Sequence, residues 1–211
     1  MNTILKGVVG STAYGLNHKD SDVDRLGIFA FDTTVLHGLS TPDESVVTKD
    51  PDLQMHEVGK FCRLALKVNT TVTELLWLDD YEESTDLGAD LVCLGSSFLS
   101  KKYVRDSYLG YATSNLKKVT AGTSTEKNQR HLYRLLIQGY ELYTTGGLTV
   151  RVSNPQDVIN FGKLPAAQVQ DTFKDYQSMF DKARSPLPDE PNTAAVERFL
   201  LKVRRNYYDK W

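Results

Sequence analysis

The chain has 211 residues, a formal net charge of −2 and an apolar fraction of 40%. This length suits one large domain or two small ones with a hydrophobic core. The near-neutral charge excludes a protein that is basic throughout, so a nucleic acid would need a local basic patch. The sequence has no basic leader before an apolar run and no apolar stretch that could span a bilayer, so we expect a cytoplasmic protein without membrane association.

The first predicted element is a buried strand over 4–9, a short apolar run that ends at Gly10. Because Gly10 has no side chain, a phosphate could approach the backbone of the following turn closely. The Ser11 hydroxyl and the free N–H groups of this turn could donate hydrogen bonds to it. Gly10 and Ser11 are therefore candidate nucleotide-binding residues.

Two carboxylates follow, Asp22 and Asp24, just before the apolar run 26–31. Since the apolar run continues directly after the pair, we expect both to lie on a strand rather than in the preceding turn. Alternate side chains of a strand share a face, so Asp22 and Asp24 would point the same way and Val23 into the core. Two carboxylates on one face suit Mg²⁺, and both are candidate catalytic and metal-binding residues.

Two other interpretations of this acidic segment are weaker or open. Asp20, Asp22 and Asp24 begin like a calcium loop, which requires Gly at its sixth position and a bidentate Glu at its twelfth. Arg25 and Phe31 occupy those positions, which argues against calcium. A purely structural polar turn is the stronger alternative.

Helical periodicity begins near residue 58 and continues to 78. Glu74 is expected to be exposed or paired locally, with support of the site from behind as the alternative. Cys62 and Cys93 lie in apolar helical stretches, which predicts reduced core thiols rather than a disulfide scaffold or a zinc site. The acidic run 79–83 is expected to be a linker to the C-terminal part.

Two longer helices are predicted over 97–118 and 124–145. In the second, basic side chains recur at spacings of three and four residues and can share one broad face, although such a face is most often merely solvated. These residues are Lys127, Arg130, His131 and Arg134.

A short strand over 148–152 and two more helices are expected after these. The tail 198–211 mixes basic residues with Tyr and Trp, which could hold single-stranded RNA or form a terminal helix that packs on the body.

The Gly10-Ser11 turn followed by Asp22-Val23-Asp24 resembles the signature of the polymerase β type nucleotidyltransferase superfamily. Segments 52–77 and 127–152 are similar to a bacterial and phage group of RNA-ligase-associated predicted nucleotidyltransferases. The likeness spans most of the chain. One departure is Asn69-Thr70-Thr71 where the group usually reads Asn-Pro-Thr, which loosens a turn without touching an expected ligand.

The resemblance implies a third carboxylate on a neighbouring strand. Short strand-like runs flank the turn 49–52, and Asp52 is the candidate because its strand could pair beside Asp22 and Asp24. Glu57 is the alternative.

The resemblance also places Lys127, His131 and Arg134 where they would face the cleft and bind the triphosphate or an RNA phosphate.

The sequence thus predicts an α+β fold, with a small mixed sheet flanked by helices over 1–82 and a mainly helical part over 83–211 that completes the cleft. The expected activity is transfer of a nucleoside monophosphate from an NTP to an acceptor hydroxyl, with release of pyrophosphate. Two Mg²⁺ ions, or Mn²⁺, would serve as cofactors. An RNA end, such as that of a tRNA, is the expected acceptor. A protein, a small molecule, or an inactive nucleotide- or RNA-binding module are the alternatives, and the NTP and the oligomeric state stay open.

Overall fold

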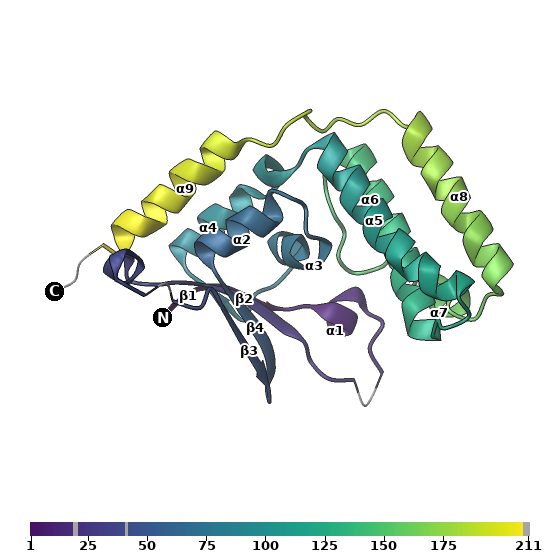
Figure 1. The fold of residues 1–211 in the computed structure, drawn as a ribbon, viewed down its shortest axis with the longest axis horizontal. Helices are drawn as coiled ribbons and strands as arrows, with labels where there is room; N and C mark the ends of the chain where they lie inside the picture. Colours follow the sequence, from purple (N-terminus) through teal and green to yellow (C-terminus); the bar gives the residue numbers. More distant parts are fainter. Residues whose placement is uncertain (19–20, 41, 209–211) are drawn as a thin grey trace. The chain divides into compact units, whose positions relative to one another are not determined.

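The computed structural model describes residues 1–18, 21–40 and 42–208, and the chain divides into two compact units (Figure 1). Unit 1 joins Met1–Phe98 to the chain from Pro191 onward, and unit 2 comprises Leu99–Glu190. The fold is α+β with a mixed sheet and a helical C-terminal region, as the sequence predicts. The predicted division into a catalytic core over 1–82 and a helical part over 83–211 stays a prediction. Asp20 and the last three residues of the tail lie outside the described residues.

The described part of unit 1 contains a five-stranded sheet in the order β3-β4-β2-β1-β5. Its central strands β2 and β4 are parallel, and the other neighbouring pairs are antiparallel. The predicted first strand and the hairpin of β3 and β4 are confirmed. The strands are β1 (Asn2–Val8), β2 (Arg25–Ala30), β3 (Ser45–Lys49), β4 (Asp52–Glu57) and β5 (Glu83–Ser84).

The acidic run 79–83, predicted as a linker, ends in the edge strand β5. Leu5 and Lys6 of β1 pair with β5, and the Lys6 ammonium forms an ion pair with Glu83. The run joins the sheet because its acidic side chains meet basic partners on β1 and β2.

Helices α2, α4 and α9 lie on one face of this sheet (Figure 1). Apolar side chains of the helices and strands form one core, which includes Ile4, Leu26, Phe61, Leu91 and Phe199. The helices of unit 1 are α1 (Gly10–Tyr14), α2 (Val58–Ala65), α3 (Thr70–Thr73), α4 (Asp86–Cys93) and α9 (Thr193–Asn206), with 3₁₀ turns η1 (Thr33–His37), η2 (Glu74–Trp77) and η3 (Gly95–Phe98).

Two predictions about these helices need correction. The helical stretch expected to continue to residue 78 is not one regular helix after α2. It consists of the single turn α3, which the Asn69 side chain caps at the Val72 N–H, followed by η2. Cys62 is buried as predicted, but Cys93 is exposed. Leu87 and Leu91 set the buried face of α4, and a residue two positions after Leu91 points away from it.

Unit 2 contains α5 (Lys101–Thr120), α6 (Glu126–Thr145), α7 (Pro155–Phe161) and α8 (Ala166–Lys182). The two long helices are confirmed as α5 and α6, which pack against each other and on α8. A capping box of Thr125 and Asn128 begins α6, and Gly146 in the left-handed conformation ends it. After α6 come α7 and α8, and α9 then belongs to unit 1.

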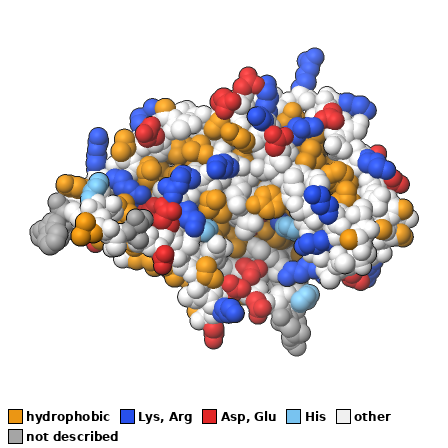
Figure 2. Space-filling view, viewed as in Figure 1, with side chains coloured by type: hydrophobic (Ala, Val, Ile, Leu, Met, Phe, Trp, Pro, Cys, Tyr) orange, Lys and Arg blue, Asp and Glu red, His pale blue; other side chains and the backbone are white. Residues whose placement is uncertain are grey.

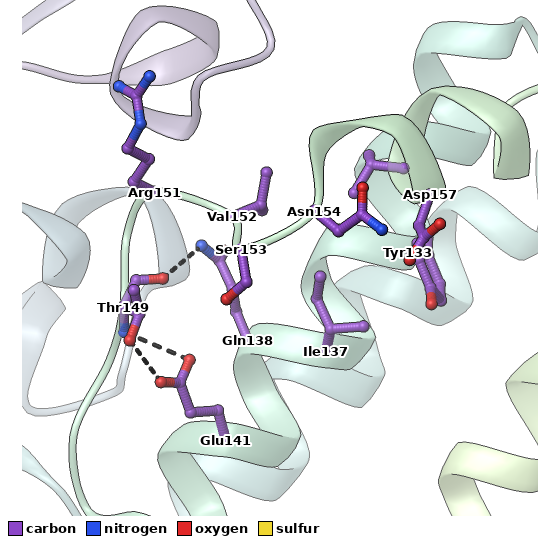
Figure 3. Close-up of a pocket in the computed structure, with 11 residues that line it drawn as sticks. Tyr133, Ile137, Gln138, Glu141, Thr149, Arg151, Val152, Ser153, Asn154 and Asp157 are labelled. Carbon is purple, nitrogen blue, oxygen red and sulfur yellow. Dashed lines mark hydrogen bonds between the residues drawn. The ribbon is translucent and has the colours of Figure 1, made fainter.

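The segment 148–152, predicted as a short strand, is a loop held against α6 (Figure 3). The Gln138 side-chain amide donates to the carbonyl oxygens of Thr149 and Val150 at 3.1 and 2.8 Å. The Glu141 carboxylate accepts from the Thr149 backbone N–H at 3.3 Å and from its hydroxyl at 2.6 Å. These bonds take the place of strand pairing.

Lysine and arginine side chains are spread over the face shown in Figure 2, with acidic side chains among them. This distribution accords with the net charge of −2. Among the described residues, no helix combines the length and apolar character that crossing a membrane requires. The cytoplasmic location stays a prediction.

Candidate active site

Asp22 and Asp24 lie in the irregular segment before β2, not on the strand as predicted, because β2 begins at Arg25. Asp24 is still tied to the sheet, since its carbonyl oxygen accepts a hydrogen bond from the Val9 N–H at 2.9 Å. Val23 was expected in the core but is 38% exposed. The chain here lies beyond the end of the strand, so alternation does not bury a side chain.

Arg25 holds this acidic segment in place. One guanidinium nitrogen donates to the Val23 carbonyl oxygen at 3.2 Å, and the Nε donates to the Glu82 carboxylate at 2.8 Å. The link joins the segment to the chain that leads into β5.

The Gly10 turn meets the Asp24 carboxylate. Gly10 has a positive φ of 68°, and a Cβ placed on it would lie 2.1 Å from Asp24 Oδ2 and 2.9 Å from Asp24 Cγ. We expected the space beside Gly10 to admit a phosphate, but the carboxylate occupies the part that a Cβ would need. Glycine is therefore required at this position for the approach of Asp24 as well as for the backbone conformation.

A second contact fixes α1, and the sequence did not reveal it. The Tyr14 hydroxyl lies 2.8 Å from each oxygen of the Glu74 carboxylate, which is 2% exposed. Glu74 was expected to be exposed or paired locally. It is instead buried and bonded to a residue sixty positions away. The signals were a tyrosine inside the Gly-Ser turn and a glutamate among apolar residues.

The parallel pairing of β2 and β4 places Asp52 at the same end of the sheet as the acidic segment. Arg25 is opposite Leu53 in the register, so Asp24 and Asp52 each immediately precede a paired residue. Asp52 is the first residue of β4 and is exposed. The predicted pairing beside Asp22 and Asp24 is thus present at the level of the backbone, and the catalytic role of Asp52 stays a prediction.

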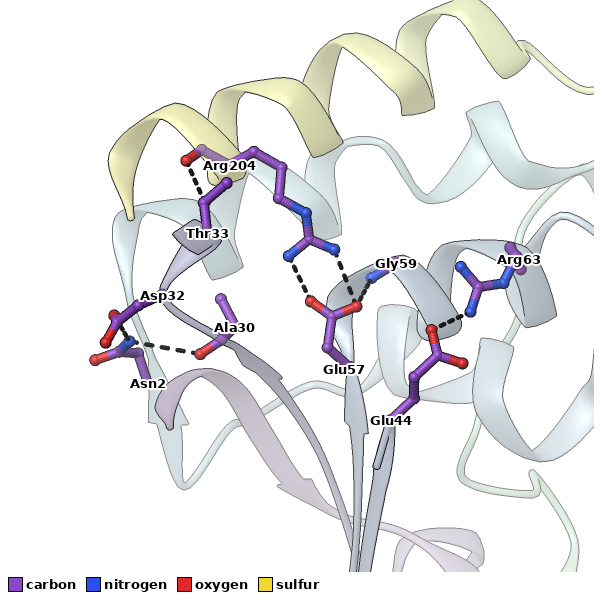
Figure 4. Close-up of polar contacts among 9 residues, drawn as sticks. All are labelled: Asn2, Ala30, Asp32, Thr33, Glu44, Glu57, Gly59, Arg63 and Arg204. Carbon is purple, nitrogen blue, oxygen red and sulfur yellow. Dashed lines mark hydrogen bonds and ion pairs between the residues drawn. The ribbon is translucent and has the colours of Figure 1, made fainter. Parts of the chain in front are cut away.

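Glu57, the alternative third carboxylate, has a different setting (Figure 4). It lies five residues along β4, about 16 Å from Asp52 at the usual rise of a strand. Its carboxylate caps α2 through the Gly59 N–H at 2.7 Å and receives two hydrogen bonds from Arg204 of α9, at 2.6 and 3.0 Å. Since Glu57 is 2% exposed, these partners identify it as a buried structural carboxylate.

The predicted basic residues lie on α6 in unit 2, in three different environments. Lys127 is exposed, His131 is half-buried, and Arg134 is 3% exposed. The Arg134 guanidinium donates to Gln138 Oε1 at 2.6 Å and to His131 Nδ1 at 3.1 Å. Arg134 therefore supports the amide that holds the loop 148–152.

His131 does not add a positive charge to this face at neutral pH. Burial, together with Arg134, Lys118 and Lys127, lowers the pKa of His131 to about 4. An arginine can only donate, so its bond to Nδ1 leaves that nitrogen unprotonated, in agreement with a neutral ring. The binding of phosphate by Lys127, His131 and Arg134 stays a prediction.

The described residues contain no group of three or more Asp, Glu, His or Cys side chains that could hold a metal ion by themselves. Mg²⁺ bound with a nucleotide needs one or two carboxylates, because phosphate oxygens and water complete its coordination. Asp24 beside the Gly10 turn, with Asp22 and Asp52 near the same end of the sheet, fits that smaller requirement.

The mixed sheet, the Gly10-Ser11 turn against Asp24 and the acidic segment before β2 together correspond to the polymerase β type of nucleotidyltransferase. The sequence model of the RNA repair pathway DNA polymerase beta family matches residues 1–168, and the chain belongs to this family. The match covers unit 1 up to η3 together with α5, α6, α7 and the start of α8. No curated protein matches the chain in sequence.

Proposed function

We propose that this protein is a magnesium-dependent nucleotidyltransferase that moves a nucleoside monophosphate from an NTP to an acceptor hydroxyl. The observation that carries the proposal is the contact between the Gly10 turn and the Asp24 carboxylate. It brings the residues suited to bind phosphate against a residue suited to bind the metal of a metal-nucleotide complex. Membership of a polymerase β family supports the same reaction class.

In this reaction the acceptor oxygen forms a bond to the α-phosphorus of the NTP, and the bond from that phosphorus to pyrophosphate breaks. Asp22 and Asp24 would hold Mg²⁺, or Mn²⁺ in its place, with Asp52 assisting. The bound ions would supply charge neutralisation at the phosphates and a lower pKa for the acceptor hydroxyl. Ser11 and the Gly10 backbone would bind the terminal phosphates, and the protein would contribute mainly position and charge.

We propose an RNA end, such as that of a tRNA, as the acceptor. The RNA repair pathway in the description of the family supports this choice. Lys127 on the exposed face of α6 would contact a phosphate of the triphosphate or of the RNA. A protein side chain or a small molecule as acceptor, and an inactive module that binds nucleotide or RNA, are the alternative outcomes of the test.

The test is incubation of the protein with each α-labelled NTP, Mg²⁺ and total RNA, followed by separation of RNA, protein and small molecules. Label in RNA with release of pyrophosphate supports the proposal. If the Asp22→Asn variant leaves the RNA unlabelled, the transfer is assigned to this site. Label in protein or in a small molecule refutes the RNA acceptor. Nucleotide binding without transfer of label to any fraction identifies a binding module instead.

A further inference from the structure

Unit 2 contains a cavity of about 280 Å³ bounded by α6, the loop 149–154 and the first turn of α7 (Figure 3). Its wall has an apolar part, which includes Tyr133, Ile137 and Val152, and a polar part, which includes Arg151, Asn154 and Asp157. A water molecule takes about 30 Å³ of liquid, so the cavity has room for an organic group of roughly nine water volumes. This is the size of a small ligand group rather than of a complete triphosphate and its sugar.

The wall of the cavity is preformed. Gln138 and Glu141 each bind the loop through two hydrogen bonds, and Arg134 in turn donates to the Gln138 amide oxygen at 2.6 Å. A loop held at Thr149 and Val150 keeps the residues that follow it in place. A ligand entering such a cavity loses little affinity to ordering of the protein.

The polar side chains of the cavity fall into two sets. Glu141 and Gln138 are used by the loop, whereas Arg151, Asn154 and Asp157 make no side-chain hydrogen bond or ion pair with any residue that the structure describes. Asn154 precedes α7 without capping it through its side chain. Figure 3 shows the Arg151 side chain pointing away from the other labelled residues, so the second set offers an amide and a carboxylate to a ligand.

This combination fits a nucleobase better than a phosphate. A flat heteroaromatic group can cover the apolar wall while its edge bonds to side chains, and the two carboxylates Glu141 and Asp157 would repel a phosphate. Carboxylates accept from the exocyclic amino group of cytosine, and Asn bonds to the N6 and N7 edge of adenine. The family match also includes every residue that lines the cavity.

We propose that this cavity binds a nucleobase with an exocyclic amino group, and that Asp157 and Asn154 select it against uracil. The inference deepens the proposed function and rests on it for the source of the base, which is the NTP or the RNA acceptor. Both sources present the same chemistry to the cavity.

The first experiment measures calorimetrically the binding of cytidine, adenosine and uridine to the full-length protein, with a chelator present. Nucleosides lack phosphate, so the Gly10 turn and the metal do not contribute. We expect cytidine and adenosine to bind about tenfold more tightly than uridine, the value of one hydrogen bond to a charged group. Equal affinities, or no heat of binding up to the solubility limit, would overturn the proposal.

The variant Asp157→Asn replaces a pure acceptor by a group that both donates and accepts. It should weaken cytidine binding about tenfold and remove the preference over uridine. Asp175→Asn is the matched control, because Asp175 is an exposed carboxylate of the same unit that does not line the cavity. Equal effects of both variants, or tighter binding of an amino sugar than of cytidine, would refute the assignment.

The same two variants identify the source of the base. A loss of CTP affinity in Asp157→Asn assigns the cavity to the NTP, and a loss confined to a short single-stranded RNA assigns it to the acceptor. If Asp157→Asn changes neither the CTP affinity nor the RNA affinity, the proposal is overturned. Nucleoside binding without any transfer of label would leave this inference standing and refute the proposed function. Transfer of label without nucleoside binding would refute this inference and leave the proposed function standing.

Discussion

Substitution of Gly10 by Ala tests the contact on which the proposed function depends. The new Cβ would lie 2.1 Å from Asp24 Oδ2, where ordinary contacts begin at 3.4 Å, so the carboxylate or the turn must move by roughly 1 Å or more. A displacement of 1 Å in a catalytic geometry can cost about 100-fold in rate. We therefore expect kcat/KM for nucleotidyl transfer to fall about 100-fold.

The substitution also forces an alanine into a left-handed conformation, which costs about 1–2 kcal/mol of unfolding free energy by itself. Gly122→Ala is a matched control for this second effect. Gly122 has the same φ of 68°, and a Cβ placed there meets nothing within 4 Å. The control should lose the same amount of unfolding free energy from the left-handed backbone, about 1–2 kcal/mol, and it should keep its transfer activity.

Urea unfolding and steady-state kinetics on both variants separate the two effects. Gly10→Ala should lose more unfolding free energy than Gly122→Ala, and it alone should lose transfer activity. Full activity of a folded Gly10→Ala protein would show that the position of Asp24 against the turn has no catalytic importance.

Three further outcomes follow from other residues. Asp22→Asn should abolish transfer without lowering the free energy of unfolding, because it removes a charge from an acidic segment; Asp43→Asn, an exposed carboxylate of the same unit, should keep its activity. Arg134→Ala should lower the free energy of unfolding by about 1.5–3 kcal/mol, since Gln138 loses a charged donor; an unchanged stability with a weaker, less salt-dependent NTP affinity would favour phosphate binding instead. Because the pKa of His131 is about 4 in the folded chain and about 6.5 when unfolded, stability should fall by about 2 kcal/mol from pH 7 to pH 5. His131→Gln should remove most of this loss, and an unchanged pH dependence would contradict the neutral buried ring.

Local patterns predicted much of the fold. The apolar run before Gly10 became β1, the turn around Pro51 became a hairpin, and the periodic stretches became α5 and α6. These elements follow from side-chain alternation and helical spacing, which a short window of sequence contains. The prediction from alternation that Val23 points into the core was wrong, because β2 begins only at Arg25.

The long-range contacts that hold the candidate site and its scaffold lie beyond any such window. Tyr14 meets Glu74 across sixty positions, and Glu57 meets Arg204 across 147. A glutamate among apolar residues indicates burial, as at Glu74, but the local sequence does not identify its distant partner. The choice between Asp52 and Glu57 was open for this reason. The register of β2 and β4 shows which end of the sheet each residue occupies, and the catalytic role of Asp52 stays a prediction.

The return of the chain as α9 ties its C-terminal segment to the unit that carries the acidic residues. Residues 169–211 lie outside the family match, yet Phe199 and Val203 are buried in the core of unit 1. Each such side chain contributes about 1.5–3 kcal/mol on burial. Arg204 adds the two hydrogen bonds that satisfy the buried Glu57, at the point where β4 passes into α2. Because β4 also begins with Asp52, one strand connects the candidate site at one end to the α9 contact at the other, so α9 stabilises the scaffold that positions the candidate carboxylates.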